Sequence, residues 1–177
     1  MSSTGSEEED NHSFTSTSIS DVATEEDLDA RPPSEKIEDR SSDPDAEDKA
    51  QRLKDQGNAE LAAGHYLPAI DSYSHGLEYQ PKNAILLSNR ALAYIKVENF
   101  GLALTDSDAA IEADPAYAKG YYRRASANFA LHHFKLARKD FRSVCKITPK
   151  SKDARAKIAA VEKVIREEAF AKAIEAD

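Results

Sequence analysis

The chain has 177 residues and a formal net charge of −8, with 32% charged and 40% hydrophobic residues. This length fits one domain with an appendage, or two small domains. No run approaches 18 consecutive apolar residues, and the N-terminus lacks an apolar signal region, so we expect neither a membrane span nor a secretory precursor. The single cysteine excludes an intramolecular disulfide and a zinc site built from cysteines.

The charge is distributed unevenly along the chain. Residues 1–49 contain 16 Asp/Glu and 4 Lys/Arg, a net charge of −12, whereas residues 50–177 contain 16 Asp/Glu and 20 Lys/Arg, a net charge of +4. The first segment has no apolar periodicity, so it cannot offset a backbone entropy cost of about 1–2 kcal/mol per residue. We therefore predict an acidic disordered arm over residues 1–46. A solubilising tail is its simplest role, and a regulatory arm phosphorylated at Ser6 or Ser20 is the alternative.

The rest of the chain repeats itself every 34 residues, in copies at 50–83, 84–117 and 118–151. A small residue, an aromatic residue, an alanine and a proline recur at fixed offsets. This period and these markers resemble the tetratricopeptide repeat, or TPR. The markers are Gly57, Ala91 and Ala125; Tyr66, Phe100 and Phe134; Ala69, Ala103 and Ala137; and Pro81, Pro115 and Pro149.

The TPR resemblance implies that each copy forms two antiparallel helices, here called A and B. The small residues would allow the two helices to pack closely, and each proline would follow helix B, because proline disfavours helix in the preceding residue. Residues 153–177 carry a further helical stripe of apolar residues, so we predict a capping helix there. The predicted fold is all-α, a right-handed α-solenoid of three TPR helix pairs plus this helix, within a domain at 47–177. The stripe consists of Ala154, Ile158, Val161 and Ile165, with Phe170 and Ile174 expected to continue it.

Polar residues on the A helices are candidates for binding, because the A helices of a TPR solenoid line its concave face. Lysine supplies a point charge, arginine a fork that grips carboxylate, and asparagine both donors and an acceptor for peptide amides. Asparagine is also a poor helix former, so its presence there calls for a reason. We predict a peptide-binding groove that captures a C-terminal carboxylate, with solvated helix faces as the alternative. Its residues are Lys54, Asn58, Asn89, Lys96, Lys119 and Arg123.

Five of these residues, all except Lys96, match the two-carboxylate clamp of TPR co-chaperones, and in that family a further cation lies at the place of Lys96. The resemblance implies binding of the Glu-Glu-Val-Asp C-terminus of a cytosolic heat-shock protein 90-class chaperone. The segments at 119–125 and 168–174 further resemble the TPR domains of the protein phosphatase 5 family. That resemblance implies a domain that targets and autoinhibits an attached serine/threonine phosphatase domain absent from this chain, in the cytoplasm or also the nucleus. A standalone TPR co-chaperone scaffold is the alternative.

The sequence shows no catalytic constellation of its own. The metal-binding motifs of serine/threonine phosphatases are absent, and so is a phosphate-binding glycine loop. Adjacent helical side chains point about 100° apart, so His132 and His133 are poorly placed to share a metal. We expect a non-enzymatic chain with no cofactor, the two metal ions being confined to the absent phosphatase domain. We also expect no nucleic-acid partner, because Lys and Arg are dispersed among acidic residues without interleaved aromatics.

Overall fold

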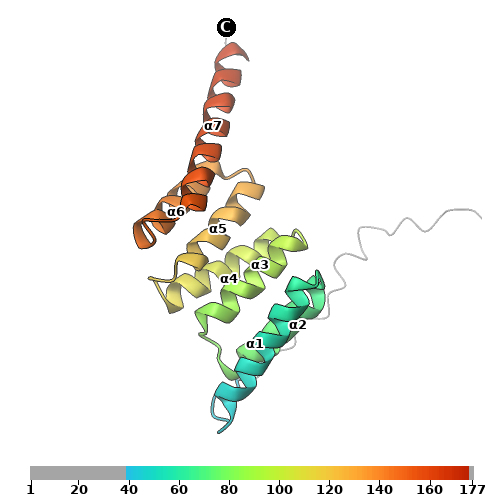
Figure 1. The fold of residues 1–177 in the computed structure, drawn as a ribbon. Coiled ribbons are helices and arrows are strands. Elements are labelled where there is room, and N and C mark those ends of the chain that lie inside the picture. Colours follow the sequence, from blue (N-terminus) through green and yellow to red (C-terminus); the bar gives the residue numbers. More distant parts are fainter. Residues whose placement is uncertain (1–38, 176–177) are drawn as a thin grey trace, which may run out of the picture. The chain divides into compact units, whose positions relative to one another are not determined.

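The computed structural model describes residues 39–175, and the described part consists of seven helices with no strand. This confirms the predicted all-α TPR fold (Figure 1). Short turns join consecutive helices, and the A helices are the odd-numbered members of the three pairs. The helices are α1 (Ala46–Ala62), α2 (Tyr66–Tyr79), α3 (Ala84–Lys96), α4 (Phe100–Ala113), α5 (Ala118–Ala130), α6 (Phe134–Ile147) and α7 (Lys152–Glu175).

The pattern of helix contacts separates an inner row from an outer row. Within each pair helix A packs against helix B, and α7 packs against α6. The A helices also contact one another, since α1 touches α3 and α3 touches α5, whereas no comparable contact joins α2 to α4 or α4 to α6. In a stack of helix pairs, the row whose members approach each other lies on the concave side. The helices that carry the candidate residues therefore form the inner row.

The small repeat positions lie where helix A meets helix B. A Cβ atom on Gly57 would come within 2.6 Å of the Tyr73 ring, so only glycine fits opposite this tyrosine without a shift. Ala91 and Ala125 occupy the same position in the next pairs, and both are fully buried. The aromatic marker Phe134 begins α6 and is buried in the core beneath α7. The close approach of the two helices explains why the sequence pattern requires small residues here.

Two arginines join neighbouring helix pairs, and we call each of them, with its carboxylate and hydroxyl partners, a clip. Arg90 of α3 grips the Asp106 carboxylate of α4 with two hydrogen bonds of 2.7 and 2.8 Å, and its third nitrogen donates to Ser74 Oγ of α2 at 2.9 Å. Arg124 of α5, 34 residues later, grips Asp140 of α6 at 2.9 and 2.7 Å. Its remaining nitrogen donates to Asp108 of α4 at 2.7 Å. Each clip thus joins an A helix to its own B helix and to the B helix before it.

The capping helix follows the prediction only over its first half. Ala154 and Val161 are buried, but Phe170 and Ile174 are 70% and 61% exposed. The expectation that they continue the apolar stripe is wrong. At about 100° per residue they lie roughly 140° and 180° around the helix from Ile165. The observed helix runs over Lys152–Glu175, and residues 176–177 lie outside the described part.

The predicted acidic arm lies outside the described residues over 1–38, and turns at 41–45 precede α1. The backbone N–H of Arg40 donates to the Glu78 carbonyl at 2.7 Å, and Lys49 Nζ lies 2.6 Å from Asp43 Oδ2. The first contact holds residues ahead of α1 against the end of α2, and the second holds them against α1. Within residues 39–175, no helix is both long and apolar enough to cross a membrane.

The clips generate a stability prediction. We expect Arg90→Ala to lower the free energy of unfolding by about 3–5 kcal/mol, because it leaves the buried Asp106 carboxylate without its partner. Arg142→Ala serves as the control, since Arg142 pairs with Glu162 at the surface and its loss should cost about 0–1 kcal/mol. Urea unfolding of both variants measures the difference, and equal losses would contradict the clip.

Candidate peptide-binding groove

The six predicted residues lie on three neighbouring helices of the inner row. Lys54 and Asn58 are one turn apart on α1, and Lys119 and Arg123 are one turn apart on α5. Asn89 lies in the middle of α3, which ends at Lys96. Contacts of α1 with α3 and of α3 with α5 bring the three helices side by side. No hydrogen bond or ion pair between described side chains joins Lys96 to the other five. Of the six, only Asn58 and Asn89 are joined to each other by a hydrogen bond between described side chains.

The two asparagines are linked and oriented. Asn58 Oδ1 accepts a hydrogen bond from Asn89 Nδ2 at 3.0 Å and another from the Tyr73 hydroxyl at 2.9 Å. With its oxygen occupied twice, the Asn58 amide presents its NH₂ group as a donor, while Asn89 keeps its own oxygen as an acceptor. This pair of side chains can receive a peptide carbonyl or carboxylate at one point and a peptide N–H at the other.

Tyr73 is a functional residue that sequence reasoning missed. It is not one of the repeat markers or candidate binding residues, yet its hydroxyl donates a hydrogen bond from helix B to Asn58 on helix A. Burial raises its pKa to about 12, and the nearby Glu60 carboxylate adds to the shift, so the hydroxyl stays a proton donor at neutral pH. The glycine at position 57 makes room for the ring. The only signal in the sequence was that this position holds a tyrosine here but Ser107 and Phe141 in the other copies.

Arg123 and Arg124 are adjacent in the sequence but have opposite environments. Arg124 makes ion pairs with Asp140 and Asp108. Arg123 makes no ion pair with a described residue, and its buried Nε has no hydrogen-bond partner. Burial lowers the pKa of Arg123, against the opposing influence of Tyr122 and Tyr117, although an arginine remains charged at neutral pH. A carboxylate bound at this guanidinium would offset the cost of its desolvation.

The three lysines complete a group of cations without internal counter-ions. Lys54 Nζ donates to Gln51 Oε1 at 2.7 Å, which is a neutral acceptor. Lys96 and Lys119 are exposed. None of the three makes an ion pair within residues 39–175. Positive charge in the groove is therefore left available for an anionic ligand.

The site is an open surface and not an enclosed pocket. Cavities of about 530, 310 and 270 Å³ occur elsewhere, and none of the six residues lines them. Small-molecule sites are usually concave cavities that bury most of the ligand, whereas an extended peptide can lie along an open groove. Among the described residues, no group of three or more His, Cys, Asp or Glu side chains is arranged to hold a metal ion. The side chains present here can form charge-assisted hydrogen bonds and hydrogen bonds to peptide amides.

Comparison with known proteins gives a consistent picture. No protein-family model matches the chain. Serine/threonine-protein phosphatase 5 of Rattus norvegicus is 44% identical over 129 residues, which cover 73% of this chain but only 26% of that protein. The chain thus spans about a quarter of the length of this relative.

Solved structures extend the comparison to the fold. The first TPR domain of Spaghetti, bound to the HSP90 peptide SRMEEVD, superposes with a TM-score of 0.65 and 34% identity, over 67% of this chain and 94% of that one. The second TPR domain of human RNA polymerase II-associated protein 3, in complex with the HSP70 peptide SGPTIEEVD, gives 0.63 and 32%, over 66% and 98%. The chain belongs to the TPR family, and its repeat region is homologous to the TPR region of serine/threonine-protein phosphatase 5.

Proposed function

We propose that this chain binds the free C-terminal end of an acidic peptide ending in Glu-Glu-Val-Asp, presented by a heat-shock protein 90-class chaperone. The observation that carries this proposal is the group of cations without ion pairs on the inner helices, next to an oriented pair of asparagines. The terminal Asp of such a peptide carries two carboxylates. Lys119 and Arg123 on α5 and Lys54 on α1 supply the complementary charge, and the amides of Asn58 and Asn89 supply hydrogen bonds to the peptide backbone.

The relatives support the same ligand chemistry. The two TPR domains described above bind peptides from HSP90 and HSP70 that share the ending EEVD. At 34% and 32% identity their domains superpose on most of this chain. Selection between the two chaperone classes would depend on residues upstream of that shared ending.

The second part of the proposal concerns what the domain serves. At 44% identity to serine/threonine-protein phosphatase 5, the chain is proposed to target an attached phosphatase domain to chaperones in the cytoplasm or nucleus, and to hold it inactive until the peptide binds. The catalytic metal ions would then be bound outside this chain. The alternative is a TPR scaffold without an enzyme. The attached phosphatase is favoured if phosphatase metal-binding motifs are encoded after Asp177 and phosphatase activity rises when the peptide is added. The scaffold without an enzyme is favoured if both are absent.

Calorimetric titration with Met-Glu-Glu-Val-Asp tests the recognition of a free carboxylate. We expect a micromolar dissociation constant, about −8 kcal/mol. The same peptide with an amidated C-terminus should bind at least about tenfold more weakly, because the amide removes one of the two anions that the cations recognise. Equal affinity of the two peptides would rule out a carboxylate clamp.

The isolated environment of Arg123 predicts different effects on binding and on stability. Arg123→Met should weaken binding roughly 30-fold or more, because a charge-assisted hydrogen bond to the carboxylate is worth about 2–3 kcal/mol. It should leave the free energy of unfolding nearly unchanged, because it removes a desolvated charge that makes no ion pair with a described residue and whose internal contact is a cation–π contact with Tyr122. Lys82→Ala, at an exposed lysine outside the groove, is the control for charge and should change neither quantity. A large loss of stability in Arg123→Met would show that Arg123 is structural.

The hydrogen bond from Tyr73 to Asn58 predicts a smaller effect. Tyr73→Phe should lower the free energy of unfolding by about 1 kcal/mol and weaken peptide binding a few-fold, because Asn58 loses the group that orients it. The native protein should also lose stability as the pH rises from 10.0 to about 12, since the unfolded tyrosine ionises first. The variant should lose less over this range, with Tyr122, whose pKa is also about 12, still contributing. Unchanged binding would contradict the orienting role.

A further inference from the structure

The positive charge of the repeat region is concentrated in one short stretch. Residues 134–157 contain 9 Lys/Arg and 2 Asp/Glu, a net charge of +7, whereas residues 50–133 carry −1 and residues 158–177 carry −2. The expectation that cations are dispersed among acidic residues is therefore wrong for this stretch. It comprises α6 and the beginning of α7.

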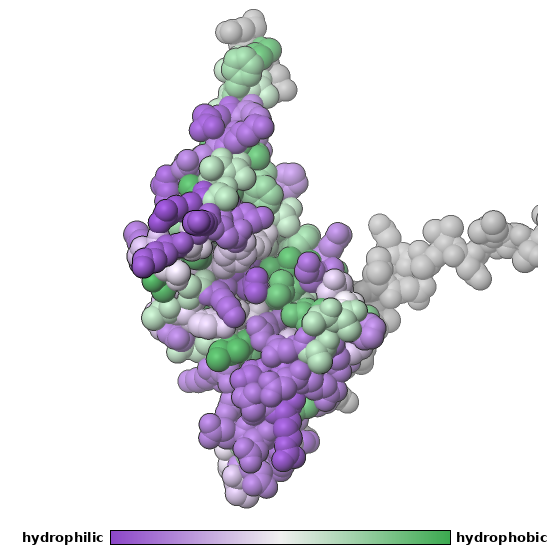
Figure 2. Space-filling model, in the orientation of Figure 1, coloured by the Kyte–Doolittle hydropathy of each residue, from purple (hydrophilic) through white to green (hydrophobic). Residues whose placement is uncertain are grey.

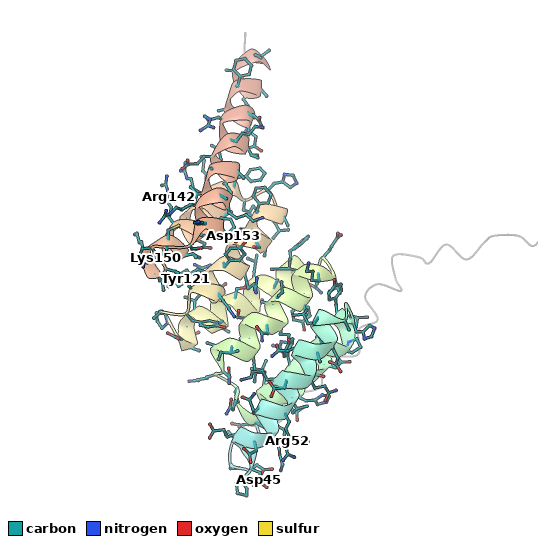
Figure 3. The ribbon with its side chains drawn as sticks, in the orientation of Figure 1. Asp45, Arg52, Tyr121, Arg142, Lys150 and Asp153 are labelled. Atoms are coloured by element: carbon teal, nitrogen blue, oxygen red, sulfur yellow. The ribbon has the colours of Figure 1, made fainter. Side chains whose placement is uncertain are left out.

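These cations form one surface. At about 100° per residue, the five on α6 fall within an arc of roughly 100°, which contains none of the buried side chains of Phe134, Ala137 and Phe141. All but Arg138 are exposed, as are two lysines at the α6–α7 turn. Figure 2 shows hydrophilic side chains over this region, and Figure 3 shows Arg142 and Lys150 projecting from it. We call this surface the basic face; it consists of Lys135, Arg138, Lys139, Arg142, Lys146, Lys150 and Lys152.

Little of this charge is neutralised locally. Arg142 pairs with Glu162 of α7 at 2.8 Å, and the other six members make no ion pair within residues 39–175. The one acidic residue of α6, Asp140, is buried and already gripped by Arg124. The surface therefore keeps a high positive potential.

The TPR fold does not require this charge. The positions one repeat earlier than Arg142 and Lys146 are Asp108 and Glu112 of α4, both exposed and both acidic. Because equivalent positions pack in the same way in each repeat, the fold tolerates either a positive or a negative side chain at these two positions. The basic face is thus a property of the third repeat alone.

We propose that the basic face is a second binding surface, which takes an acidic polypeptide segment with no need for a free C-terminus. Exposed ammonium groups spaced three and four residues apart along one helix suit a linear series of carboxylates. An anionic membrane fits less well, because a plane wide enough to reach α4 would bring headgroups against Asp108 and Glu112. A single-stranded nucleic acid fits less well because no member of the face is aromatic and could stack a base.

The basic face is separate from the groove. The groove residues lie on α1, α3 and α5, whereas the basic face lies on α6 and the start of α7. On α5, Arg124 points to α6, and its neighbour Arg123 lies about 100° around the helix. The two surfaces should therefore be occupied at the same time and independently of each other.

The test uses the whole chain and a fluorescent, C-terminally amidated peptide of eight Glu residues, measured by anisotropy at low salt. Neutralising Lys135, Lys139 and Lys146 together, each to Gln, should weaken binding about tenfold, and binding should fall steeply as salt is added. The matched control neutralises Lys82, Lys163 and Lys172, which are equally exposed but outside the face, and should leave the affinity within twofold. Circular dichroism and thermal melts check that both triple variants remain folded.

Two further measurements distinguish binding at the basic face from binding in the groove. Saturation with Met-Glu-Glu-Val-Asp should leave binding of the Glu peptide unchanged, and Lys119→Ala should do the same, so failure of the groove proposal would not affect this result. Equal losses in the two triple variants would overturn the proposal, and so would displacement by the groove peptide. It would also be overturned if phosphatidylserine vesicles or a DNA duplex bound through these lysines while the Glu peptide did not.

Discussion

The close packing of each A helix against its B helix is the constraint on which the rest of the structure depends. Gly57 leaves room for the Tyr73 ring, and Ala91 and Ala125 keep the same approach in the next two pairs. Because the helices are this close, the Tyr73 hydroxyl on helix B can reach Asn58 on helix A. The same packing sets A helices side by side, so residues from three repeats meet at one surface. The arrangement of the candidate site is a consequence of helix pairing.

Charge in this domain performs two different tasks, and the environment of each side chain decides which. Arg90 and Arg124 are held by buried carboxylates and join helices of successive repeats. Arg123, beside Arg124 in the chain, makes no ion pair with a described residue and is partly desolvated. Removing one partner of a buried ion pair destabilises the fold. A partly desolvated charge without an ion pair has an uncompensated desolvation cost, which an anionic ligand could offset. The cations of the basic face differ from both, since all but Arg138 are exposed and, among the described residues, Arg142 alone makes an ion pair.

Much of the fold could be predicted because its signals are local and repeated. The 34-residue period, the small residues and the prolines indicated three helix pairs, which are present as α1 to α6, and the capping helix expected at 153–177 is present over Lys152–Glu175. The six candidate residues could be placed on the inner helices for the same reason. The error over Phe170 and Ile174 arose because the apolar stripe was extended by residue type without following its angle around the helix. Both side chains are exposed, far from the stripe that ends at Ile165.

The sequence by itself determined the repeat, the helices and which helix carries each candidate residue, because helical periodicity and a fixed register place residues without reference to distant contacts. Only the tertiary structure decided which charges are paired. The partners of Arg90 and Arg124 lie 16 residues away in each direction, and the hydrogen bond between Asn58 and Asn89 spans 31 residues. Two adjacent arginines look identical in a sequence. Their surroundings differ because one points into the contact between helices and the other lies about 100° around the helix, where no carboxylate of residues 39–175 pairs with it.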